Sequence, residues 1–495
     1  MTDIEKSINV DFDSNLLEDD PRPVRALCIH GHFYQPPREN PLTGIIPEEI
    51  GAAPYPNWNV RIHTECYQPN ATLGNFERIS FNVGPTLFKW MEKYDPITTR
   101  RIIEQDRSNV KRFGVGNAMA QAYNHTILPL ASKKDKDTQI YWSVADFLHR
   151  FGRPPKGMWL PETAVDIETL ETLVDHGIEF TILAPWQAAD PAIDPTEPYF
   201  VHLPSKRKIA VFFYQKELSG GISFNPRMTT NAHFFALKEL IRFFNATKYS
   251  QGENQLLLLA SDGELYGHHQ SLREWFLAYL VNGAGARAGI RLTYPALWLR
   301  DNPPKNEVKI LERTSWSCHH GVHRWWRDCD CNPGNGTWKW HLRRALNNFS
   351  KKVDQLYMDY LNPFGIEPWQ LRNRYIHVLL EETSLVDIIH DLRDRVKDPN
   401  SRDIDDRDRT TIRMLLEAQR ERQRMFTSCG WFFEDLNRIE PLNNIAYAAQ
   451  AANLVFKATG VDLTPDLLED LSLVRSQRSS TSGDEAFDRF WRSYF

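Results

Sequence analysis

The sequence predicts an α/β protein in which a parallel barrel is followed by an all-α region. Short apolar stretches alternate with helical patterns through residues 24–294, and this alternation is typical of parallel sheets whose strands are joined by crossover helices. Five apolar stretches end in polar or aromatic residues, so a barrel with its functional groups on one face fits best. From residue 337 onward the pattern contains helices and no convincing strand.

The expected strands are apolar runs bounded by turn residues or helical patterns. They cover residues 24–30, 79–85, 156–161, 179–184, 208–214, 256–260 and 290–294. The expected helices cover 86–94, 140–150, 166–176, 231–245 and 271–280, and then 338–361, 369–380, 405–425, 442–459 and 465–474. We therefore predict a flexible leader at 1–20, a barrel at 21–313, a loop at 314–336 over the barrel mouth, and a helical domain at 337–495.

Composition excludes several classes of protein. The net charge of −5 gives no basic field for nucleic acid, and no apolar run reaches the roughly 18 residues of a membrane helix. Residues 1–20 are acidic and lack a signal-peptide pattern. Six cysteines in 495 residues do not form a disulfide framework. We expect a cytoplasmic protein with no membrane or nucleic-acid partner, and the sequence does not indicate its oligomeric state.

The stretch that carries most of the chemistry is Leu256 to His269. A run of leucines reads as a strand buried on both faces, and it ends in Asp262, Glu264 and His268. An α/β enzyme places its reactive groups at this end of a strand. Asp262 and Glu264 would share a face if the strand continued past Gly263.

Histidines follow two other stretches. His30 and His32 end the first strand, with Gln35 close behind. They can contact a ligand, bind a metal, or satisfy buried loop carbonyls. His125 lies at a chain reversal, where ligand binding and loop packing are both open interpretations.

A further carboxylate, Glu162, follows the strand that contains Trp159. Pro161 ends regular pairing, so Glu162 is presented at the strand exit, either as a reactive group or as a helix-capping residue. Trp159, and Trp186 after the next strand, offer flat faces on which sugars stack. The chain has 15 Trp and 17 Tyr, although tryptophan is also a good core residue.

The loop at 314–336 contains Cys318, His320, Cys329 and Cys331. Three cysteines and three histidines within fourteen residues (318–331) invite a zinc interpretation. The spacing lacks paired C-x-x-C knuckles, so we expect an aromatic and histidine loop and assign no metal and no cofactor.

Glu162 and Asp262, at the ends of different strands, suit glycoside chemistry. One ionised carboxylate would attack the anomeric carbon while the other, protonated, would donate to the departing oxygen. The proton donor needs a raised pKa from burial or a neighbouring negative charge. We therefore expect the two carboxyls to titrate as a coupled pair.

These residues resemble a known family. Gly157-Met-Trp-Leu-Pro-Glu162 and Ser261-Asp262-Gly-Glu264-Leu-Tyr-Gly267 are similar to the two catalytic motifs of glycoside hydrolase family 57, and His32 with Gln35-Pro36 resembles its first motif. His125-Thr-Ile-Leu-Pro129 resembles its second motif, and Cys318-His-His320-Gly321 is a partial match to a fifth.

The resemblance implies an incomplete parallel (β/α)7 barrel followed by a helical region, and a retaining mechanism on α-glucans by a hydrolase or a glucanotransferase. It makes Glu162 the nucleophile and Asp262 the acid/base. By the same resemblance His32 and His125 would bind sugar near the cleavage point. The other candidate binding residues rest on their positions after the predicted strands and in the loop, and not on the family. These are His30, Gln35, Trp159, Trp186, Glu264, His268 and His320. Two extra residues before Gln35 leave open whether His30 or His32 is the functional one.

Two other functions remain as alternatives. A metal-dependent enzyme of a related barrel, such as a polysaccharide deacetylase or α-mannosidase, would use His30, His32 and Asp262 as ligands. A non-catalytic glucan-binding protein is the second alternative, although the presence of both acids argues against it.

Overall fold

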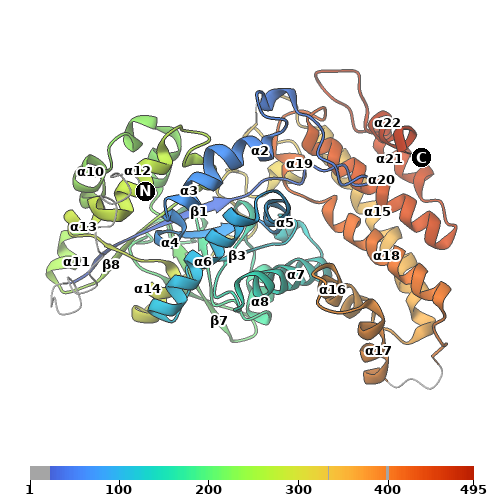
Figure 1. Cartoon of the computed structure of the whole chain (residues 1–495), viewed down its shortest axis with the longest axis horizontal. Coiled ribbons are helices and arrows are strands. Elements are labelled where there is room, and N and C mark those ends of the chain that lie inside the picture. The colour runs from blue at the N-terminus through green and yellow to red at the C-terminus, as the bar shows by residue number, and fades with distance from the viewer. Residues whose placement is uncertain (1–22, 333, 397–400, 495) are drawn as a thin grey trace.

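The structure is a computed structural model that describes residues 23–332, 334–396 and 401–494. The expected leader at 1–20 lies outside the described residues. Strands and their crossover helices make up the first part of the chain, and long helices pack side by side in the last part (Figure 1). The predicted fold class, a parallel barrel followed by an all-α region, is confirmed.

Seven strands of the described chain pair in one parallel series, in the order β8-β1-β2-β3-β4-β5-β7. Their bounds are β1 Arg25–Phe33, β2 Ser80–Val83, β3 Ala120–Gln121, β4 Met158–Trp159, β5 Phe180–Leu183, β7 Lys208–Phe213 and β8 Gln255–Asp262. Between β7 and β8 the described bonding is one backbone hydrogen bond, from Gln215 N to Leu258 O at 2.7 Å. The last strand of the series, β7, therefore lies next to the first, β8, but the two do not form a full hydrogen-bonded ladder. This is expected for an incomplete seven-stranded barrel.

Register places functional residues beside one another. In β1, His32 lies opposite Asp262 of β8 on one side and Asn82 of β2 on the other. Every residue of β8 is buried except Asp262 at its end, because the strand is covered on both faces until it leaves the barrel. The carboxyl ends of these three strands therefore meet at one edge, where the site is found.

Three predictions about the barrel were inaccurate. The strand at 290–294 is only β9, Arg291–Leu292, and it pairs with Ala26 and Leu27, at the opposite end of β1 from the site. The helix at 231–245 is broken into short α, π and 3-10 segments. Strands β6 (Tyr199–His202) and β10 (Asn306–Glu307) form a small side sheet with β7 that the apolar pattern did not indicate.

Helices surround the strands and then form the second region. In the barrel part they are α2 Trp58–Ile62, α3 Gln68–Thr72, α4 Asn75–Arg78, α5 Pro85–Tyr94, α6 Pro96–Phe113, α7 Lys133–Phe151, α8 Ile167–Asp175, α9 Lys216–Phe224, α10 Ala232–Phe234, α11 Ala246–Ser250, α12 Arg273–Tyr279, α13 Gly285–Arg287 and α14 Pro295–Asp301. In the helical region they are α15 Trp338–Leu361, α16 Pro368–Leu379, α17 Leu385–Val396, α18 Asp406–Arg424, α19 Cys429–Phe432, α20 Ile439–Thr459, α21 Thr464–Ser472 and α22 Gly483–Tyr494. No helix in the described part of the chain combines the length and apolarity that crossing a bilayer requires.

Helix α7 joins the two regions. Ile140, Phe147 and Phe151 pack in the barrel core, whereas Trp142 and Ala145 pack in the core of the helical region. A barrel helix normally buries one face against its sheet, so a second apolar face needs a second partner. The helical region is therefore packed onto the barrel through a continuous apolar contact.

A buried ionic network reinforces this contact. Asp135 Oδ1, on α7, accepts hydrogen bonds from Arg422 Nη1 at 2.6 Å and Gln423 Nε2 at 2.7 Å, and it lies 3.1 Å from Arg372 Nη1. Burial alone would raise the pKa of Asp135, but the charges of Arg422 and Arg372 lower it well below its ordinary value. The ionised form is therefore the one that stabilises the junction.

We expect Asp135→Asn to lower the free energy of unfolding by about 3–5 kcal/mol at neutral pH, because it leaves buried arginines without their counter-charge. The loss should shrink in acid, below the ordinary carboxyl pKa of about 4, where the wild-type chain also loses this contribution. Chemical denaturation across a pH series measures it. The matched control is Asp466→Asn, in an exposed pair with Lys352, which should change stability by less than about 1 kcal/mol. Equal effects of the two variants would contradict the account.

Candidate active site

Glu162 lies on a strained turn directly after β4. Its backbone is left-handed, with φ 58° and ψ 21°, and Thr163 follows with φ 49°. Residues other than glycine rarely adopt this backbone conformation, and it costs a β-branched residue such as threonine more free energy than other residues. Gln187 holds the turn: it accepts from Thr163 Oγ1 and donates to Thr163 O, both at 2.8 Å. The turn aims the Glu162 side chain away from the regular path of the strand.

Two donors from the loop at 314–336 hold the Glu162 carboxyl. Trp316 Nε1 donates to Oε2 at 2.9 Å and Ser317 Oγ donates to the same oxygen at 2.7 Å. Trp316 N also donates to Glu162 O at 3.0 Å. Burial raises the pKa of Glu162, while the hydrogen bonds from Ser317 and Trp316 and the charge of Arg324 oppose that rise. The carboxyl is thus partly desolvated and fixed in orientation.

Asp262 is the neighbouring carboxyl. Desolvation and the charge of Glu162 raise its pKa to about 7. Both causes act in the same direction, although the side chain is the one exposed residue of β8. A carboxyl with this pKa is populated in both protonation states near neutral pH. The charge of Glu162 is therefore the second of two causes that raise the pKa of Asp262, and coupled titration of the two acids stays a prediction.

Glu264 does not share a strand face with Asp262. The strand ends at Asp262, and residues Gly263–Leu265 form a 3-10 turn. A Cβ at Gly263 would lie 2.3 Å from a Phe33 ring carbon, so only glycine allows this close turn. Glu264 Oε1 instead accepts from Tyr67 Oη at 2.7 Å and Tyr34 N at 3.0 Å. Burial and the charge of Asp262 raise the pKa of Glu264 to about 8.

Asn82 connects the two histidines of β1. His30 Nε2 lies 3.1 Å from Asn82 Oδ1, and Asn82 Nδ2 lies 3.0 Å from His32 Nδ1 and 2.7 Å from Gln121 Oε1. An amide oxygen only accepts and an amide nitrogen only donates. His30 therefore carries its proton on Nε2. His32 Nδ1 lies closer to Asn82 Nδ2 than to Asn82 Oδ1, at 3.0 against 3.3 Å, so we assign it as the acceptor. Burial lowers the pKa of His30 to about 3 and that of His32 to about 4, so both rings are neutral.

His125 extends this chain of hydrogen bonds into the helical region. Its Nε2 lies 3.2 Å from His32 Nε2, and its Nδ1 lies 2.6 Å from Ser428 Oγ. Because His32 carries its proton on Nε2, His32 donates to His125, which in turn donates to Ser428. Ser428 N also donates to His125 O at 3.1 Å, which holds His125 in a left-handed conformation with φ 53°. Burial lowers the pKa of His125.

Aromatic rings pack around these histidines. Trp159 is fully buried and stacks on His30 and His32 with ring centroids 4.7 and 5.2 Å apart. Trp316 meets Trp159 edge to face at 5.1 Å. Trp186 is 36% exposed and its Nε1 donates to Ser315 O at 3.0 Å. Trp186 is therefore the more exposed of the two predicted tryptophans, whereas Trp159 packs against the histidines.

The structure brings together Glu162, Asp262, His32, His125 and Trp159. Gln35 accepts from Arg38 at 3.3 Å and is also hydrogen-bonded to Tyr67, which donates to Glu264. Two other predicted binding residues make their described contacts elsewhere: His268 lies 2.5 Å from Glu65, and His320 lies 3.1 Å from Cys329 Sγ.

Sequence reasoning missed the residues that hold this centre in place, namely Asn82, Ser317, Trp316, Gln187 and Ser428. Trp316 and Ser317 lie in the loop at 314–336 that was expected over the barrel mouth, so their position in the sequence could have indicated that they lie near the site. Ser428 lies 303 residues from His125, and no local pattern connects them.

The metal ligand set His30, His32 and Asp262 finds no support in the described residues. Both ring nitrogens of His30 are engaged, Nδ1 with Ser80 Oγ at 2.9 Å and Nε2 with Asn82. The group of potential ligands that does converge among the described residues lies in the loop after the barrel. A deacetylase-type or α-mannosidase-type metal centre at the end of β1 is therefore not favoured.

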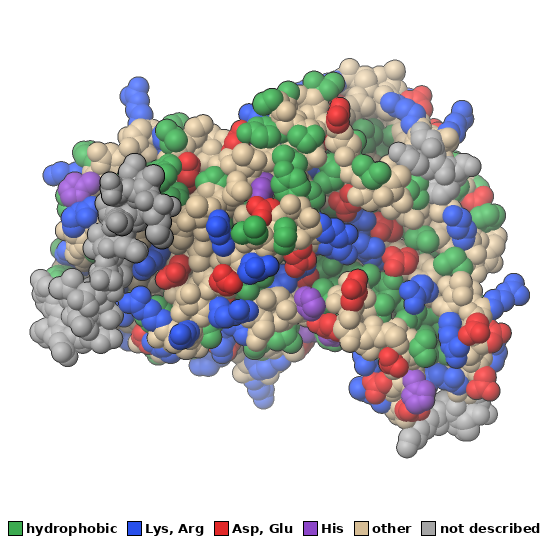
Figure 2. All heavy atoms as spheres, viewed as in Figure 1, with side chains coloured by type: hydrophobic (Ala, Val, Ile, Leu, Met, Phe, Trp, Pro, Cys, Tyr) green, Lys and Arg blue, Asp and Glu red, His purple; other side chains and the backbone are tan. Residues whose placement is uncertain are grey.

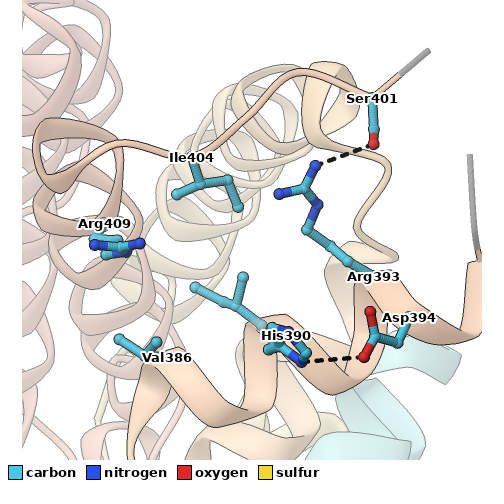
Figure 3. Close-up of a pocket in the computed structure, with 8 residues that line it drawn as sticks. Val386, His390, Arg393, Asp394, Ser401, Ile404 and Arg409 are labelled. Atoms are coloured by element: carbon cyan, nitrogen blue, oxygen red, sulfur yellow. Dashed lines mark hydrogen bonds and ion pairs between the residues drawn. The ribbon is translucent and has the colours of Figure 1, made fainter. Parts of the chain in front are cut away.

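A hollow in the helical region lies apart from the carboxylates. It is lined by α17 and the segment before α18, including Val386, His390, Arg393 and Ile404 (Figure 3). His390 pairs with Asp394 and Arg393 donates to Ser401, both at 3.1 Å. Figure 2 shows basic and acidic side chains interspersed over this end of the molecule. Its polar groups pair with one another, so it has no evident role in the chemistry.

Comparison with known proteins agrees with these features. The model of the family described as "Glycosyl hydrolase family 57" matches residues 57–310, and one described as "Domain of unknown function (DUF3536)" matches 335–494. An alpha-amylase from Pyrococcus abyssi is 23% identical over 48% of this chain and 36% of its own length. A 4-alpha-glucanotransferase from Thermococcus litoralis is 24% identical over 43% of this chain and 30% of its own. The chain thus spans about a third of the length of these curated relatives.

A solved structure is similar over nearly the whole chain. An exo-type maltose-forming amylase from Pyrococcus sp. ST04 superposes with a TM-score of 0.71 at 16% identity, covering 94% of this chain and 88% of that one. At this identity the likeness establishes the fold, including the helical region after the barrel.

We expect Glu162→Gln to lower the pKa of Asp262 below about 7, because the substitution removes the neighbouring negative charge. The pKa should stay above the ordinary aspartate value of about 3.9, since desolvation remains. Carboxyl carbon NMR across a pH titration measures it. Glu179→Gln, which changes an exposed glutamate paired with Lys156, is the control and should leave Asp262 unchanged. An unshifted Asp262 in Glu162→Gln would mean that the two carboxyls are not coupled.

Proposed function

The chain belongs to glycosyl hydrolase family 57, and on that premise we propose that it cleaves α-glucosidic bonds of α-glucans by a retaining mechanism. Glu162 is the nucleophile and Asp262 is the acid/base. The observation that carries the proposal is the pair itself: an oriented glutamate beside an aspartate whose pKa is raised to about 7, first by burial and then by the charge of that glutamate.

Glu162 suits the nucleophile role because its carboxylate is desolvated yet held by two donors on one oxygen. Attack on the anomeric carbon forms a glycosyl ester, and the proton of Asp262 goes to the departing oxygen. Once esterified, Glu162 is neutral, so one of the causes that raise the pKa of Asp262 disappears. Asp262 then becomes a stronger acid, and its ionised form can act as the base that activates the second acceptor.

His32 and His125 serve as sugar-binding residues near the cleavage point. Both are neutral and add no charge beside Asp262. Their Nε2 atoms are paired with each other, so sugar hydroxyl groups would take the place of this hydrogen bond, one ring donating and the other accepting. Both ring nitrogens of His30 are hydrogen-bonded, Nδ1 to Ser80 and Nε2 to Asn82. His30 therefore acts as a positioning residue that holds the Asn82 side chain. His32 keeps 6% of its surface exposed and pairs with His125, whereas His30 has no exposed surface, which favours His32 over His30 as the residue that meets substrate.

The substrate class follows from the family and from relatives named as an alpha-amylase and a 4-alpha-glucanotransferase. The glycosyl ester can pass to water, which is hydrolysis, or to a sugar hydroxyl, which is transfer. Trp186, which is 36% exposed, is the aromatic residue on which a glucan chain would stack. We place the enzyme in the cytoplasm, because all six cysteines are free thiols, as a reducing compartment maintains them.

Maltoheptaose incubation tests this function. We expect the wild-type chain to produce shorter oligomers, with new reducing ends if water is the acceptor, or shorter and longer oligomers without new reducing ends if it transfers. Glu162→Gln and Asp262→Asn should each lose activity on the order of 10³-fold or more while retaining the fold. The control Glu307→Gln changes an exposed glutamate paired with His202 and should keep full activity.

No turnover of linear or branched glucan by the folded wild-type chain would contradict the proposal. Glucan binding without turnover would instead indicate a non-catalytic glucan-binding protein.

A further inference from the structure

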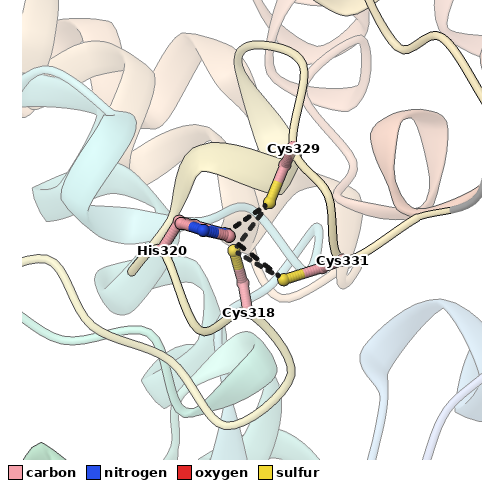
Figure 4. A group of neighbouring side chains, drawn as sticks. All are labelled: Cys318, His320, Cys329 and Cys331. Carbon is pink, nitrogen blue, oxygen red and sulfur yellow. Dashed lines mark hydrogen bonds between the residues drawn. The ribbon is translucent and has the colours of Figure 1, made fainter.

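Four side chains of the loop after the barrel converge on one point, although no regular element holds them together. They are Cys318, His320, Cys329 and Cys331 (Figure 4), and their ligand atoms all lie within 4.8 Å of one another. Cys318 Sγ lies 3.5 Å from Cys329 Sγ and 3.8 Å from Cys331 Sγ. His320 Nδ1 lies 3.1 Å from Cys329 Sγ and 3.6 Å from Cys331 Sγ.

Three of these four separations are close to those of a tetrahedral metal site, and the fourth, 3.1 Å between His320 Nδ1 and Cys329 Sγ, is shorter. With Zn–S bonds of about 2.3 Å and a Zn–N bond of about 2.05 Å, tetrahedral angles place sulfur atoms about 3.8 Å apart and sulfur about 3.6 Å from nitrogen. Three thiolates and one imidazole in this geometry favour zinc over harder cations. We propose that Cys318, His320, Cys329 and Cys331 bind one structural Zn²⁺ ion.

A disulfide does not explain the cluster as well. A disulfide requires sulfur atoms about 2.05 Å apart, whereas the two measured separations are 3.5 and 3.8 Å. Three cysteines would also leave one unpaired. Hydrogen bonds among thiols are weak and would not by themselves hold four side chains together. A shared cation accounts for the convergence of all four.

The backbone of the loop is shaped for this cluster. Gly321 has φ 78° and donates its N–H to Cys318 O at 3.1 Å. A Cβ at this position would lie 2.3 Å from Arg313 O, so only glycine allows the turn that brings His320 back toward Cys318. On the other side, Asp328 Oδ1 accepts from Cys329 N at 3.0 Å and from Gly336 N at 2.7 Å. Both ligand pairs therefore sit on fixed turns.

The charged side chains around the cluster are also consistent with a bound zinc ion. A zinc ion with three thiolates and a neutral histidine carries a net charge of −1, and cations lie beside it. Arg324 Nη2 donates to Cys331 O at 3.2 Å. Lys339 is buried: burial and the charge of Arg324 lower its pKa to about 8, while the charges of Cys329, Asp328 and Cys318 oppose that fall. A buried lysine needs a negative partner, and the thiolate cluster would supply one.

The site has a structural role and no open coordination position, because four protein ligands complete the tetrahedron. Trp316 and Ser317, which hold the Glu162 carboxyl, directly precede Cys318. Cys318 and Cys329 also belong to the apolar core of the helical region. The metal would therefore fix the loop that positions Glu162 against the helical region.

The absence of a metal was expected from sequence because the cysteines do not form C-x-x-C pairs. The ligands instead occur as C-x-H and C-x-C pairs with eight residues between them. In the folded loop the two pairs face each other. The spacing in the sequence alone did not indicate this arrangement.

The test is metal analysis of the full chain, purified under reducing conditions without chelator and exposed to excess zinc before desalting. We expect about one zinc per chain. Cys329→Ser, Cys331→Ser and His320→Ala should each weaken zinc binding at least tenfold. The matched control is His319→Ala, the adjacent exposed histidine outside the cluster, which should retain one zinc. Replacing zinc with cobalt should give the thiolate charge-transfer and tetrahedral d–d bands of a sulfur-rich site.

A wild-type chain that stays free of zinc after exposure to excess zinc would overturn the proposal, as would full zinc retention in the cysteine variants. Thiol titration in denaturant with chelator should find all six cysteines free, and a smaller number in metal-free protein would indicate a disulfide instead. If the cysteine variants fail to fold, the cobalt spectrum of the wild-type chain decides. None of these measurements depends on glucan activity, so failure of the metal site and failure of the proposed function are distinguishable.

Discussion

The hydrogen bonds from Trp316 and Ser317 to Glu162 Oε2 are the contacts on which the site depends. Glu162 occupies a left-handed conformation that glutamate rarely adopts, and such strain persists only where surrounding structure over-determines it. Gln187 fixes the turn from the barrel side, and the loop at 314–336 fixes the carboxyl from the other. Because that loop packs into the helical core, the orientation of a barrel carboxylate depends on a region outside the barrel.

A second dependence runs through the histidines. Ser428 accepts from His125, which accepts from His32, whose ring is oriented by Asn82. The histidine, serine and asparagine partners are uncharged, so this series of hydrogen bonds can fix the orientation of the two histidine rings without shifting the pKa of Asp262. The helical region therefore contributes to both sides of the site.

The carboxylates could be predicted from sequence because buried strands ended in polar residues at Glu162 and Asp262, and parallel strands bring such ends together. The supporting residues could not be predicted in the same way. Ser428 meets His125 through tertiary packing across 303 residues, and the grouping of His320 with the cysteines depends on the folding of an irregular loop. Helix α6, Pro96–Phe113, was missed because its face toward the barrel contains threonine and asparagine as well as isoleucine.

The central claim is that Glu162 is the nucleophile held by this loop, and trapping the covalent intermediate tests it most directly. A ring-fluorinated α-glucosyl fluoride slows both steps but needs little proton donation for the first, so the glycosyl ester accumulates. Peptide mapping by mass spectrometry should place one glucosyl group on Glu162, and the label should be absent from Glu162→Gln. A label on Asp262 or Glu264, or turnover of the reagent without any labelled glutamate, would contradict the account.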